Sequence, residues 1–357
     1  MPCLHAEKAP RPHPSFLVIR AGALGDCLLM LPALVALRTH FPQARIEVMG
    51  YHRRWEWVLG RGLVDAVHGI ERPGMHLLFC ETAAVPQSLR TFLRAYDVIL
   101  SYRPDPDGLF ARNLRTLSGR HVLSQAPFPP PPPPKVHAAD HALKVVAELG
   151  VHPLTRVPCL PLASTDLTLV QPFFSTHGID HSMERLVVVH PGSGSEAKCW
   201  PLENFAALLE ALAAEPRVRI VVVTGYAEAG VVDRLLPLLR EAEPVVAADW
   251  PLPPTAALIA HAAVFVGHDS GLTHLAAAFG RPTVALFGPT DPEIWGPRGG
   301  AVTVVRMRRP PTDTHDQSLD GGSSPWARAD VRQTFAAVRR YLALGAIRSP
   351  GDRSARS

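Results

Sequence analysis

The chain of 357 residues contains few cysteines and no long apolar run. Its five cysteines are widely separated and form no CxxC pair, which argues against a disulfide framework or a structural zinc site and fits a reducing compartment. The longest apolar run, residues 27–37, contains Pro32 and is too short to span a bilayer. Asp26 abuts this run and a strand-like FLVIR segment precedes it, a pattern unlike a secretory signal peptide.

The motifs of several enzyme classes are also missing. The chain has no GxGxxG dinucleotide fingerprint, no GK[ST] of a Walker A loop, no HxH or HExxH metal pair and no GxSxG nucleophile elbow. His137 and His141 are one helical turn apart beside Asp140, but no Glu lies between them, so they are more typical of a solvated helix start. We therefore expect no metal ion and no other cofactor.

Charge and composition indicate a globular protein of enzyme size. The net charge of +4 is small for this length and does not indicate a nucleic-acid partner, although it is compatible with an anionic substrate or membrane surface. The chain is 47% hydrophobic, and its length is sufficient for a sizeable core and for two domains. We expect residues 1–15 to be disordered and residues 348–357 to be loose, because both ends are polar.

Strand-like and helix-like segments alternate along the chain. Buried strands are expected at residues 16–20, 45–49, 97–100, 186–190, 218–224, 264–267 and 283–288, with helical patterns between them. This alternation predicts an α/β protein with parallel, doubly wound sheets. Pro32 interrupts the helical pattern after the first strand, so we expect a kink there or a helix that starts later than Asp26.

Two halves of the chain repeat the same plan. We expect a first domain over residues 16–165, an irregular linker over 166–185, a second domain over 186–325 and a closing helix over 326–347. The six prolines at 129–134 cannot be core and are expected to form a surface loop of the first domain.

A glycine-bearing turn follows the first strand. In the sequence AGALGD, Gly22 and Gly25 allow the backbone to approach a ligand closely, and Asp26 lies near a helix N-terminus at the carboxyl edge of the sheet. The alternative is that Asp26 is only an N-cap, which is common at such positions.

A second turn, HPGSGSEAKCWP at 190–201, has the composition of a phosphate-binding loop. Ser193, Gly194 and Ser195 supply backbone N–H and hydroxyl groups, and Lys198 supplies a positive charge. The alternative is a solvated loop with a surface lysine.

Two further turns carry polar groups at strand ends. In TGYAE, Gly225 allows close approach and Glu228 could accept a hydrogen bond from a ribose or base, although these residues alone favour an ordinary Glu stabilised by the helix dipole in a first turn. HDSGLTH at 268–274 opens a helix after a buried strand. Its candidate ligand-binding residues are Asp269, Ser270, Gly271 and His274, of which the first two could instead cap the helix and the last could pack.

Three blocks together resemble glycosyltransferase family 9, the lipopolysaccharide heptosyltransferases. They are FLVIRAGALGDCLLMLPALVALRTHFPQARIEVM at 16–49, VVVHPGSGSEAKCWPLENFAALL at 187–209 and VFVGHDSGLTHLAAAFGRPTVALFGPTDPEIWGP at 264–297. Each block alone is weak, but their order and spacing across almost the whole chain are specific.

The resemblance implies a GT-B fold, in which two Rossmann-like domains face a central cleft. The acceptor is then bound mainly by the N-terminal domain and the nucleotide sugar mainly by the C-terminal domain. It also implies inverting, metal-independent transfer of a heptose from ADP-heptose to a lipid A–core acceptor. The protein is then cytoplasmic, with peripheral contact at the inner face of the cytoplasmic membrane.

The family's functional residues can be matched to this sequence. Asp26 matches the general base and Lys198 the lysine that stabilises the leaving diphosphate. Ser193, Gly194 and Ser195 lie in the loop that holds the phosphates. Gly225 and Glu228 match the part of the donor site that holds the nucleoside. The residues that match the block gripping the donor sugar and diphosphate are Asp269, Ser270, Gly271 and His274.

The chain also departs from the family pattern. Cys199 replaces the usual basic or polar residue before Trp200, and residues 51–158, where acceptor choice resides, match no motif. Two alternatives therefore stay open: a GT-B glycosyltransferase that uses another nucleotide sugar for exopolysaccharide or glycan synthesis, and a non-catalytic binder of sugar nucleotides. A nicotinamide oxidoreductase is disfavoured by the missing fingerprint.

Overall fold

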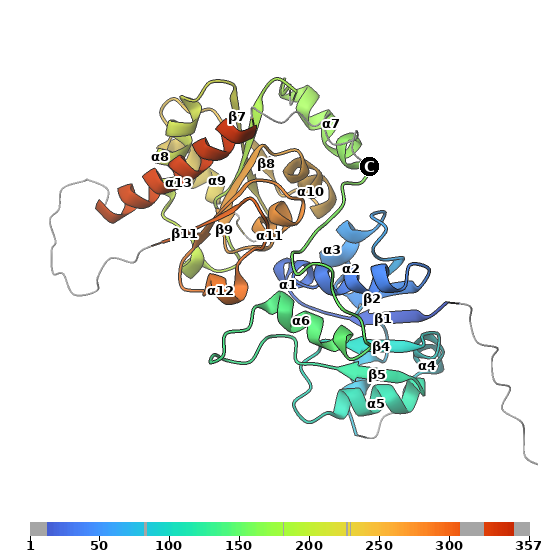
Figure 1. The fold of residues 1–357 in the computed structure, drawn as a ribbon. Coiled ribbons are helices and arrows are strands. Elements are labelled where there is room, and N and C mark those ends of the chain that lie inside the picture. The colour runs from blue at the N-terminus through green and yellow to red at the C-terminus, as the bar shows by residue number, and fades with distance from the viewer. Residues whose placement is uncertain are drawn as a thin grey trace, which may run out of the picture. The chain divides into compact units, whose positions relative to one another are not determined.

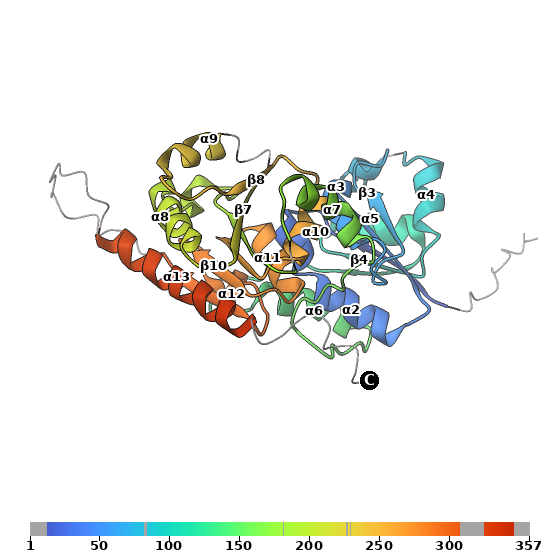
Figure 2. The ribbon, with the colours of Figure 1, turned by 90° about the horizontal axis from the view of Figure 1, so that it is seen from above.

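The computed structural model describes residues 13–81, 84–180, 182–225, 228, 230–307 and 325–345. The chain forms two compact units (Figures 1 and 2). The first contains the described residues up to Gly22, Pro32–Pro129 and Ala142–Thr155, and the second contains Ala23–Leu31, Pro130–His141 and the described residues from Arg156 onward. Of the segments expected to be disordered or loose, residues 1–12 and 348–357 lie outside the described residues. The expectation of disorder over 1–15 is wrong at Ser15, which is buried and begins the first strand, where it pairs with Arg45.

The first unit is built on a parallel sheet of five strands with the order β3-β2-β1-β4-β5. The strands are β1 (Ser15–Ile19), β2 (Arg45–Gly50), β3 (Ala66–Gly69), β4 (Val98–Ser101) and β5 (His121–Ser124). The helices between them are α2 (Leu31–His40), α3 (His52–Trp55), α4 (Gln87–Leu93) and α5 (Leu109–Ser118), and α6 (Ala138–Ala147) follows β5. Short 3-10 helices occur at η1 (Glu56–Val58) and η2 (Met75–Phe79).

The two faces of this sheet are covered by different helices. Leu17 and Ile19 share one face because side chains alternate along a strand, and they form a core with the apolar side chains of α4 and α5. Phe16 lies on the opposite face, where its ring contacts that of Phe41, directly after α2, at 5.1 Å between centroids. The expectation of a doubly wound sheet is confirmed.

The second unit contains a parallel sheet of six strands with the order β11-β10-β9-β6-β7-β8. The strands are β6 (Arg185–His190), β7 (Val218–Thr224), β8 (Val245–Ala248), β9 (Val264–His268), β10 (Thr283–Phe287) and β11 (Val302–Arg306). The helices are α1 (Leu24–Leu28), α7 (Asp166–Thr176), α8 (Leu202–Ala213), α9 (Val231–Leu235), α10 (Leu252–Ala260), α11 (Gly271–Ala278), α12 (Pro292–Trp295) and α13 (Pro325–Gly345). Short 3-10 helices occur at η3 (Glu196–Lys198) and η5 (Leu236–Leu238).

The closing helix α13 belongs to the core of this second unit. Val338 and Leu342 of α13 are buried with Phe205 of α8 against the sheet face that carries Val187 and Val189. The opposite face is covered by α10 and α11, as the ribbon shows (Figure 1). Burial of both faces explains why the strands read as continuous apolar runs rather than as alternating ones.

Prolines mark both an expected and an unexpected feature. Pro32 was expected to interrupt the first helical pattern, and the structure confirms it: α1 ends at Leu28 and α2 begins at Leu31. The expectation of an irregular linker is wrong for residues 166–176, which form α7 with Pro172 inside the helix. Val170 and Phe174, one turn apart, are buried on one side of α7, and this burial stabilises a helix that the proline disfavours.

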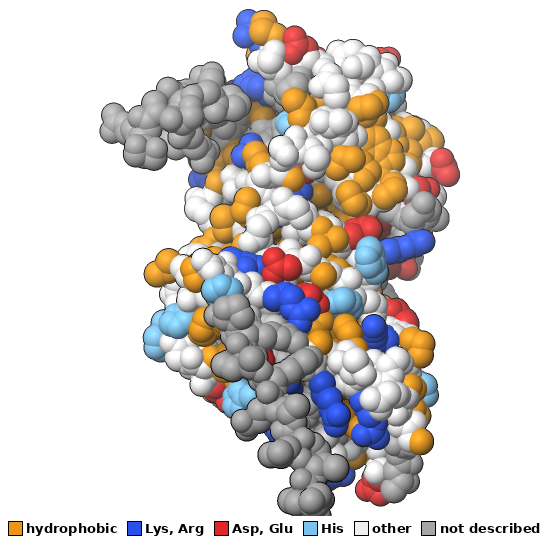
Figure 3. Space-filling view, turned by 90° about the vertical axis from the view of Figure 1, so that its right-hand side faces the viewer, with side chains coloured by type: hydrophobic (Ala, Val, Ile, Leu, Met, Phe, Trp, Pro, Cys, Tyr) orange, Lys and Arg blue, Asp and Glu red, His pale blue; other side chains and the backbone are white. Residues whose placement is uncertain are grey.

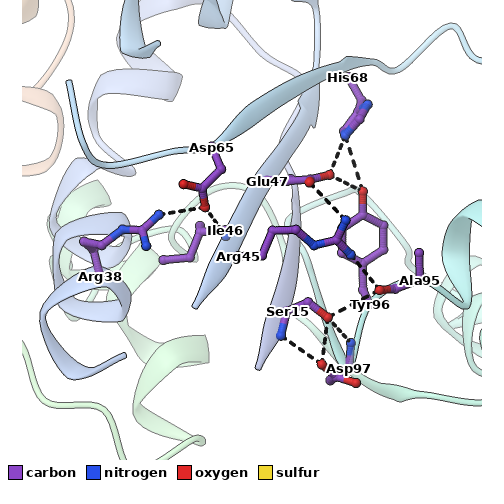
Figure 4. Close-up of polar contacts among 10 residues, drawn as sticks. All are labelled: Ser15, Arg38, Arg45, Ile46, Glu47, Asp65, His68, Ala95, Tyr96 and Asp97. Carbon is purple, nitrogen blue, oxygen red and sulfur yellow. Dashed lines mark hydrogen bonds and ion pairs between the residues drawn. The ribbon is translucent and has the colours of Figure 1, made fainter. Parts of the chain in front are cut away.

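A buried carboxylate lies inside the first unit (Figure 4). Glu47 on β2 accepts a hydrogen bond of 2.5 Å from the hydroxyl of Tyr96, and Nε2 of His68 lies 2.6 Å away. Arg45 adds an ion pair of 3.2 Å. Burial alone would raise the pKa of Glu47, but the hydrogen bonds from Tyr96 and His68 lower it below its usual value. Because Glu47 lies in the amino half of β2, away from the strand's carboxyl end, we interpret this network as structural.

On the face drawn in Figure 3, the two units differ in the side chains that they expose. Hydrophobic side chains gather on one part of the second unit, drawn at the top, whereas Lys and Arg are more frequent on the first unit (Figure 3). The large, exposed apolar side chains of the second unit include Leu162, Leu167, Leu169 and Met183. Within the described part of the chain, no helix combines the length and the apolar character needed to cross a membrane.

Candidate active site

The candidate site lies where the strand order of the second sheet reverses. β6 and β9 are neighbours in that sheet, and the chain leaves them toward opposite sides. In open parallel sheets, ligands bind in the crevice at the carboxyl ends of such a pair of strands. β6 ends at His190 and leads into the loop 191–201, whereas β9 ends at His268 and leads into α11. The second and third sequence blocks therefore meet at this edge.

A lysine and an aspartate form the centre of the site. Nζ of Lys198 lies 2.7 Å from Oδ2 of Asp269, and the hydroxyl of Thr290 donates to the same oxygen at 2.7 Å. Nε2 of His274 lies 3.9 Å from Oδ1. The side chain of Asp269 is 9% exposed and that of Lys198 is 30% exposed, so the cation reaches solvent whereas its partner does not.

This environment holds Asp269 in its ionised form. Burial alone would raise the pKa of the carboxyl group, but its interactions with His274, Lys198 and Thr290 outweigh burial and lower the pKa to about 2. The charges of Asp269 and Lys198 therefore compensate each other at neutral pH. An anion that binds beside Lys198 would compete with Asp269 for the ammonium group.

The loop after β6 exposes the groups that were expected to bind phosphate. Gly194 and Ser195 are exposed, and a side chain added at Gly194 would meet no atom within 4 Å. The hydroxyl of Ser193 donates to the backbone carbonyl of Asp269 at 3.3 Å, which ties the loop to the start of α11. Open backbone and a lysine on one loop suit a phosphate group.

Glu228 lies against the first glycine of this loop. A Cβ at Gly192 would lie 2.1 Å from Cγ of Glu228, so only glycine fits there. Oε2 of Glu228 accepts a hydrogen bond from the backbone of Gly225 at 2.7 Å, and its Oε1 lies 3.6 Å from Nε2 of His190. Burial alone would raise the pKa of Glu228, but His190 and the Gly225 amide lower it below its usual value. Glu228 has 3-10 helical conformation and lies before α9, which begins only at Val231, so it is not in the first turn of that α-helix.

Helix α11 begins at the centre of the site. Ser270 has the extended backbone of an N-cap, but its hydroxyl makes no capping bond and instead lies 3.3 Å from the hydroxyl of Thr273 and 3.4 Å from Nδ1 of His190. The helix ends as expected, since Gly280 has a φ of +69° directly after it. The first N–H groups of α11 have no partner within the helix, as at the start of any α-helix.

The GALGD turn packs directly on this helix. A Cβ at Gly25 would lie 3.4 Å from Cδ2 of His274, and a Cβ at Gly271 would lie 2.6 Å from Cβ of Leu24. Asp26, the third residue of α1, accepts a hydrogen bond from the backbone of Ala23 at 2.9 Å. Its carboxylate therefore stabilises the start of α1 from inside the helix and not from the N-cap position. Gly22 lies outside this arrangement, because it is the last residue of the first unit before α1.

Two residues of the site were not identified from the sequence. Thr290 lies directly after the GP pair that follows β10, and its hydroxyl contributes to the Asp269 cluster. His268 is a fully buried imidazole at the end of an otherwise apolar strand. The sequence offered one signal for His268, which is that a polar side chain ends a run of buried apolar residues. It offered no signal that Thr290 would contact Asp269.

The HAADH pair is not solvated. His137 and His141 are both buried, so the expectation of a solvated helix start is wrong. Nε2 of His137 lies 2.9 Å from the carbonyl oxygen of Gly296, and the adjacent Asp140 makes an ion pair of 2.7 Å with Arg298. In the part of the chain that the structure describes, no group of three or more His, Cys, Asp or Glu residues is placed to hold a metal ion.

Two sequence comparisons relate the chain to known proteins. The model of the family described as glycosyltransferase family 9 (heptosyltransferase) matches residues 155–320. Lipopolysaccharide heptosyltransferase 1 of Escherichia coli (strain K12) is 31% identical over 310 residues, which cover 82% of this chain and 93% of that protein.

Two solved structures have a similar fold. A glycosyl transferase family 9 structure from Veillonella parvula DSM 2008 has a TM-score of 0.73 at 20% identity and covers 93% of this chain and 97% of that one. The ADP-heptose lps heptosyltransferase II of E. coli has a TM-score of 0.69 at 19% identity and covers 93% of this chain and 99% of that one. At these identities the likeness shows the fold.

Proposed function

The chain belongs to glycosyltransferase family 9, and from this membership we propose that it transfers a heptose from ADP-heptose to the lipopolysaccharide core or a similar cell-envelope acceptor. It is a glycosyltransferase with the GT-B fold of two Rossmann-like units. The donor is suggested by the names of its relatives, one of which is an ADP-heptose heptosyltransferase. The observation that carries the proposal is the Lys198–Asp269 pair at the start of α11, directly beside an open loop of glycine and serine.

The donor would bind to the second unit through its diphosphate. Lys198 would exchange Asp269 for a phosphate oxygen, since an anion with two negative charges competes well for an ammonium group that is 30% exposed. The loop around Gly194 and the first N–H groups of α11 would donate to the remaining oxygens. These groups are in place before the reaction, so they stabilise the charge that develops on the leaving diphosphate.

Asp26 would act as the general base. In a single displacement, the acceptor oxygen attacks the anomeric carbon on the face opposite the diphosphate, which inverts the configuration. Asp26 accepts the hydroxyl proton as the new C–O bond forms, and the nucleoside diphosphate leaves with the electrons of the broken bond. The proposal is supported by the packing of α1 on α11, which places the helix of the base against the helix of the donor site.

Lys198 would also make the reaction independent of a metal ion. A divalent cation is one way to neutralise a leaving diphosphate. A lysine and a helix N-terminus supply positive charge at the same place without a metal ion. We further propose that the first unit binds the acceptor and that the protein meets its glycolipid acceptor at the inner face of the cytoplasmic membrane.

The experiment separates donor choice from catalysis. Thermal unfolding is measured with ADP, UDP, GDP and ADP-heptose, because a ligand that binds only the folded protein raises its stability. We expect stabilisation by ADP and ADP-heptose and transfer to a heptose-deficient core acceptor, unchanged by EDTA. Preferential stabilisation by UDP or GDP would contradict the donor, and loss of transfer in EDTA that returns with Mg²⁺ would contradict metal independence.

The variant Asp26→Asn tests the base. It should keep ADP binding and lose transfer by about a hundredfold or more, because a positioned general base contributes 10²–10⁴-fold. Asp249→Asn is the matched control: Asp249 is exposed in the same unit, and its positive φ of 57° suits asparagine. Donor binding without transfer to any acceptor in the unchanged protein would instead favour a non-catalytic binder.

A further inference from the structure

One buried imidazole joins the two ends of the donor loop. Nε2 of His268 lies 2.7 Å from the backbone N of Trp200, and Nδ1 lies 3.0 Å from the carbonyl oxygen of Gly192. The segment between these two contacts, residues 192–200, contains Ser193, Ser195 and Lys198. The side chain of His268 is fully buried, so solvent does not replace either partner.

The two contacts define the tautomer of the ring. The backbone N–H of Trp200 can only donate, so Nε2 of His268 must be the acceptor and carry no proton. Nδ1 must then carry the proton, because the carbonyl oxygen of Gly192 can only accept. A protonated ring would lose the bond to Trp200, since both nitrogens would be donors. Burial favours the neutral ring and lowers the pKa of His268 to about 4.

Two further contacts hold His268, one at its backbone and one at its ring. The hydroxyl of Thr273, on α11, donates to the backbone carbonyl of His268 at 2.5 Å. The ring of Phe205, on α8, meets the imidazole edge to face at 5.2 Å between centroids. Among the titratable neighbours are His190, whose charge would oppose protonation, and Asp269, whose charge would favour it. The contact from α11 thus holds the backbone of His268, and the packing of Phe205 from α8 orients the ring that joins the two ends of the loop.

We propose that His268 is a positioning residue: through its contacts with Gly192 and Trp200, it holds the loop 192–200 in the shape that binds the diphosphate of the nucleotide donor. This inference rests on the proposed function for the identity of the ligand. The hydrogen bonds by which His268 joins the two ends of the loop do not depend on that function. His268 itself touches no substrate. It acts through Ser193, Ser195 and Lys198, whose positions depend on where the loop begins and ends.

Three variants separate the two hydrogen bonds. His268→Gln places an acceptor near the position of Nε2 and so keeps the hydrogen bond from Trp200. His268→Asn places a donor near the position of Nδ1 and so keeps the hydrogen bond to Gly192. His268→Phe keeps a ring but removes both hydrogen bonds. The control His261→Phe makes the same change in the same unit, at a histidine whose Nδ1 lies 2.8 Å from the carbonyl oxygen of Ala257, one helical turn earlier, and whose ring packs on that of Phe174. ADP affinity is measured by calorimetry, and amide hydrogen exchange is followed at Trp200.

His268→Phe should weaken ADP binding roughly ten- to hundredfold, because two buried hydrogen bonds that order the loop are lost. The KM for the donor should rise more than kcat falls, Trp200 should exchange faster, and the Gln and Asn variants should recover part of the affinity. His261→Phe should leave ADP affinity unchanged. A His268→Phe protein that melts earlier but binds ADP as tightly as the unchanged protein would show a merely structural role and overturn the inference.

Two further measurements keep the inference separate from the proposed function. If the unchanged protein does not bind ADP, the donor assignment fails, but amide hydrogen exchange at Trp200 still tests whether His268 holds the two ends of the loop. An exchange rate at Trp200 that is the same in His268→Phe as in the unchanged protein would overturn the inference. Nitrogen chemical shifts of His268 report the tautomer directly. A proton on Nε2 at neutral pH would contradict the bond from Trp200 and overturn the inference as well.

Discussion

The contact between α1 and α11 offers a sharp test of how the second unit places Asp26. Gly271, the first residue of α11, faces Leu24 of α1 so closely that a Cβ there would lie 2.6 Å from Cβ and 2.8 Å from Cγ of Leu24. Ordinary contacts begin at 3.4 Å, so Gly271→Ala requires the two helices to separate by about 0.8 Å. The five-residue helix α1 should move, because α11 is buried against the sheet.

The expected effect is larger on catalysis than on stability. Overpacking of this kind costs roughly 1–3 kcal/mol of unfolding free energy. Asp26 would move with α1, and a displacement near 1 Å can reduce the rate by about a hundredfold. We therefore expect kcat/KM for transfer to fall about ten- to hundredfold, whereas ADP affinity changes less than about threefold, because alanine keeps the backbone N–H at the start of α11.

Gly300→Ala is the matched control. Gly300 lies in an exposed turn of the same unit, and a Cβ there would meet no atom within 4 Å. Steady-state transfer kinetics, calorimetry with ADP and urea denaturation are measured on both variants. Full transfer activity in Gly271→Ala would refute the argument that this contact positions Asp26. An equal loss of ADP affinity and activity would instead show that the start of α11, and not α1, had moved.

Three other expected outcomes concern titratable groups, two of them in the interior and one at the donor site. His137 and His268 have pKa values lowered to about 4 from 6.5, so the unfolded chain takes up protons first as the pH falls. The free energy of unfolding in urea should then be constant above pH 6.5 and decrease toward pH 4, with a share of roughly 3 kcal/mol from His268; a flat profile from pH 7 to 4 would contradict this. Tyr96→Phe removes the hydroxyl that donates to the buried Glu47 and should cost about 1–3 kcal/mol in urea denaturation, whereas a loss within experimental error would argue against the network. Lys198→Met should weaken ADP binding about tenfold or more by calorimetry, because a charge-assisted bond to phosphate is lost, and unchanged affinity would remove Lys198 from the donor site.

The sequence predicted the central strands well because both faces of each sheet are buried. Runs such as LVVVH and VRIVVVT are apolar apart from their last residues and Arg219, and they form β6 and β7 as expected. Shorter strands with mixed sequence were not predicted, for example β5 (HVLS) and β8 (VVAA), because four residues carry too little pattern. α7 was missed for a different reason, since prolines and polar residues in this segment indicated an irregular linker, whereas tertiary burial of Val170 and Phe174 stabilises a helix there.

The residue types of the site were accessible to sequence reasoning, whereas their partners were not. Glycines, serines and a lysine directly after a strand indicate a phosphate loop because local backbone and side-chain chemistry determine what such a segment can bind. The tertiary structure decided that Lys198 pairs with Asp269, which is 71 residues away, and that Thr290 and His274 share that carboxylate.

The same distinction holds for the chain as a whole. The sequence by itself determined the α/β alternation, the glycine-bearing turns and the helix break before Pro32, because these depend on neighbouring residues. Only the tertiary structure placed α1 with the second unit and His268 between the ends of its loop. Parallel strands bring the ends of distant segments to one edge of a sheet, and which side chains meet there depends on distances that no local pattern encodes.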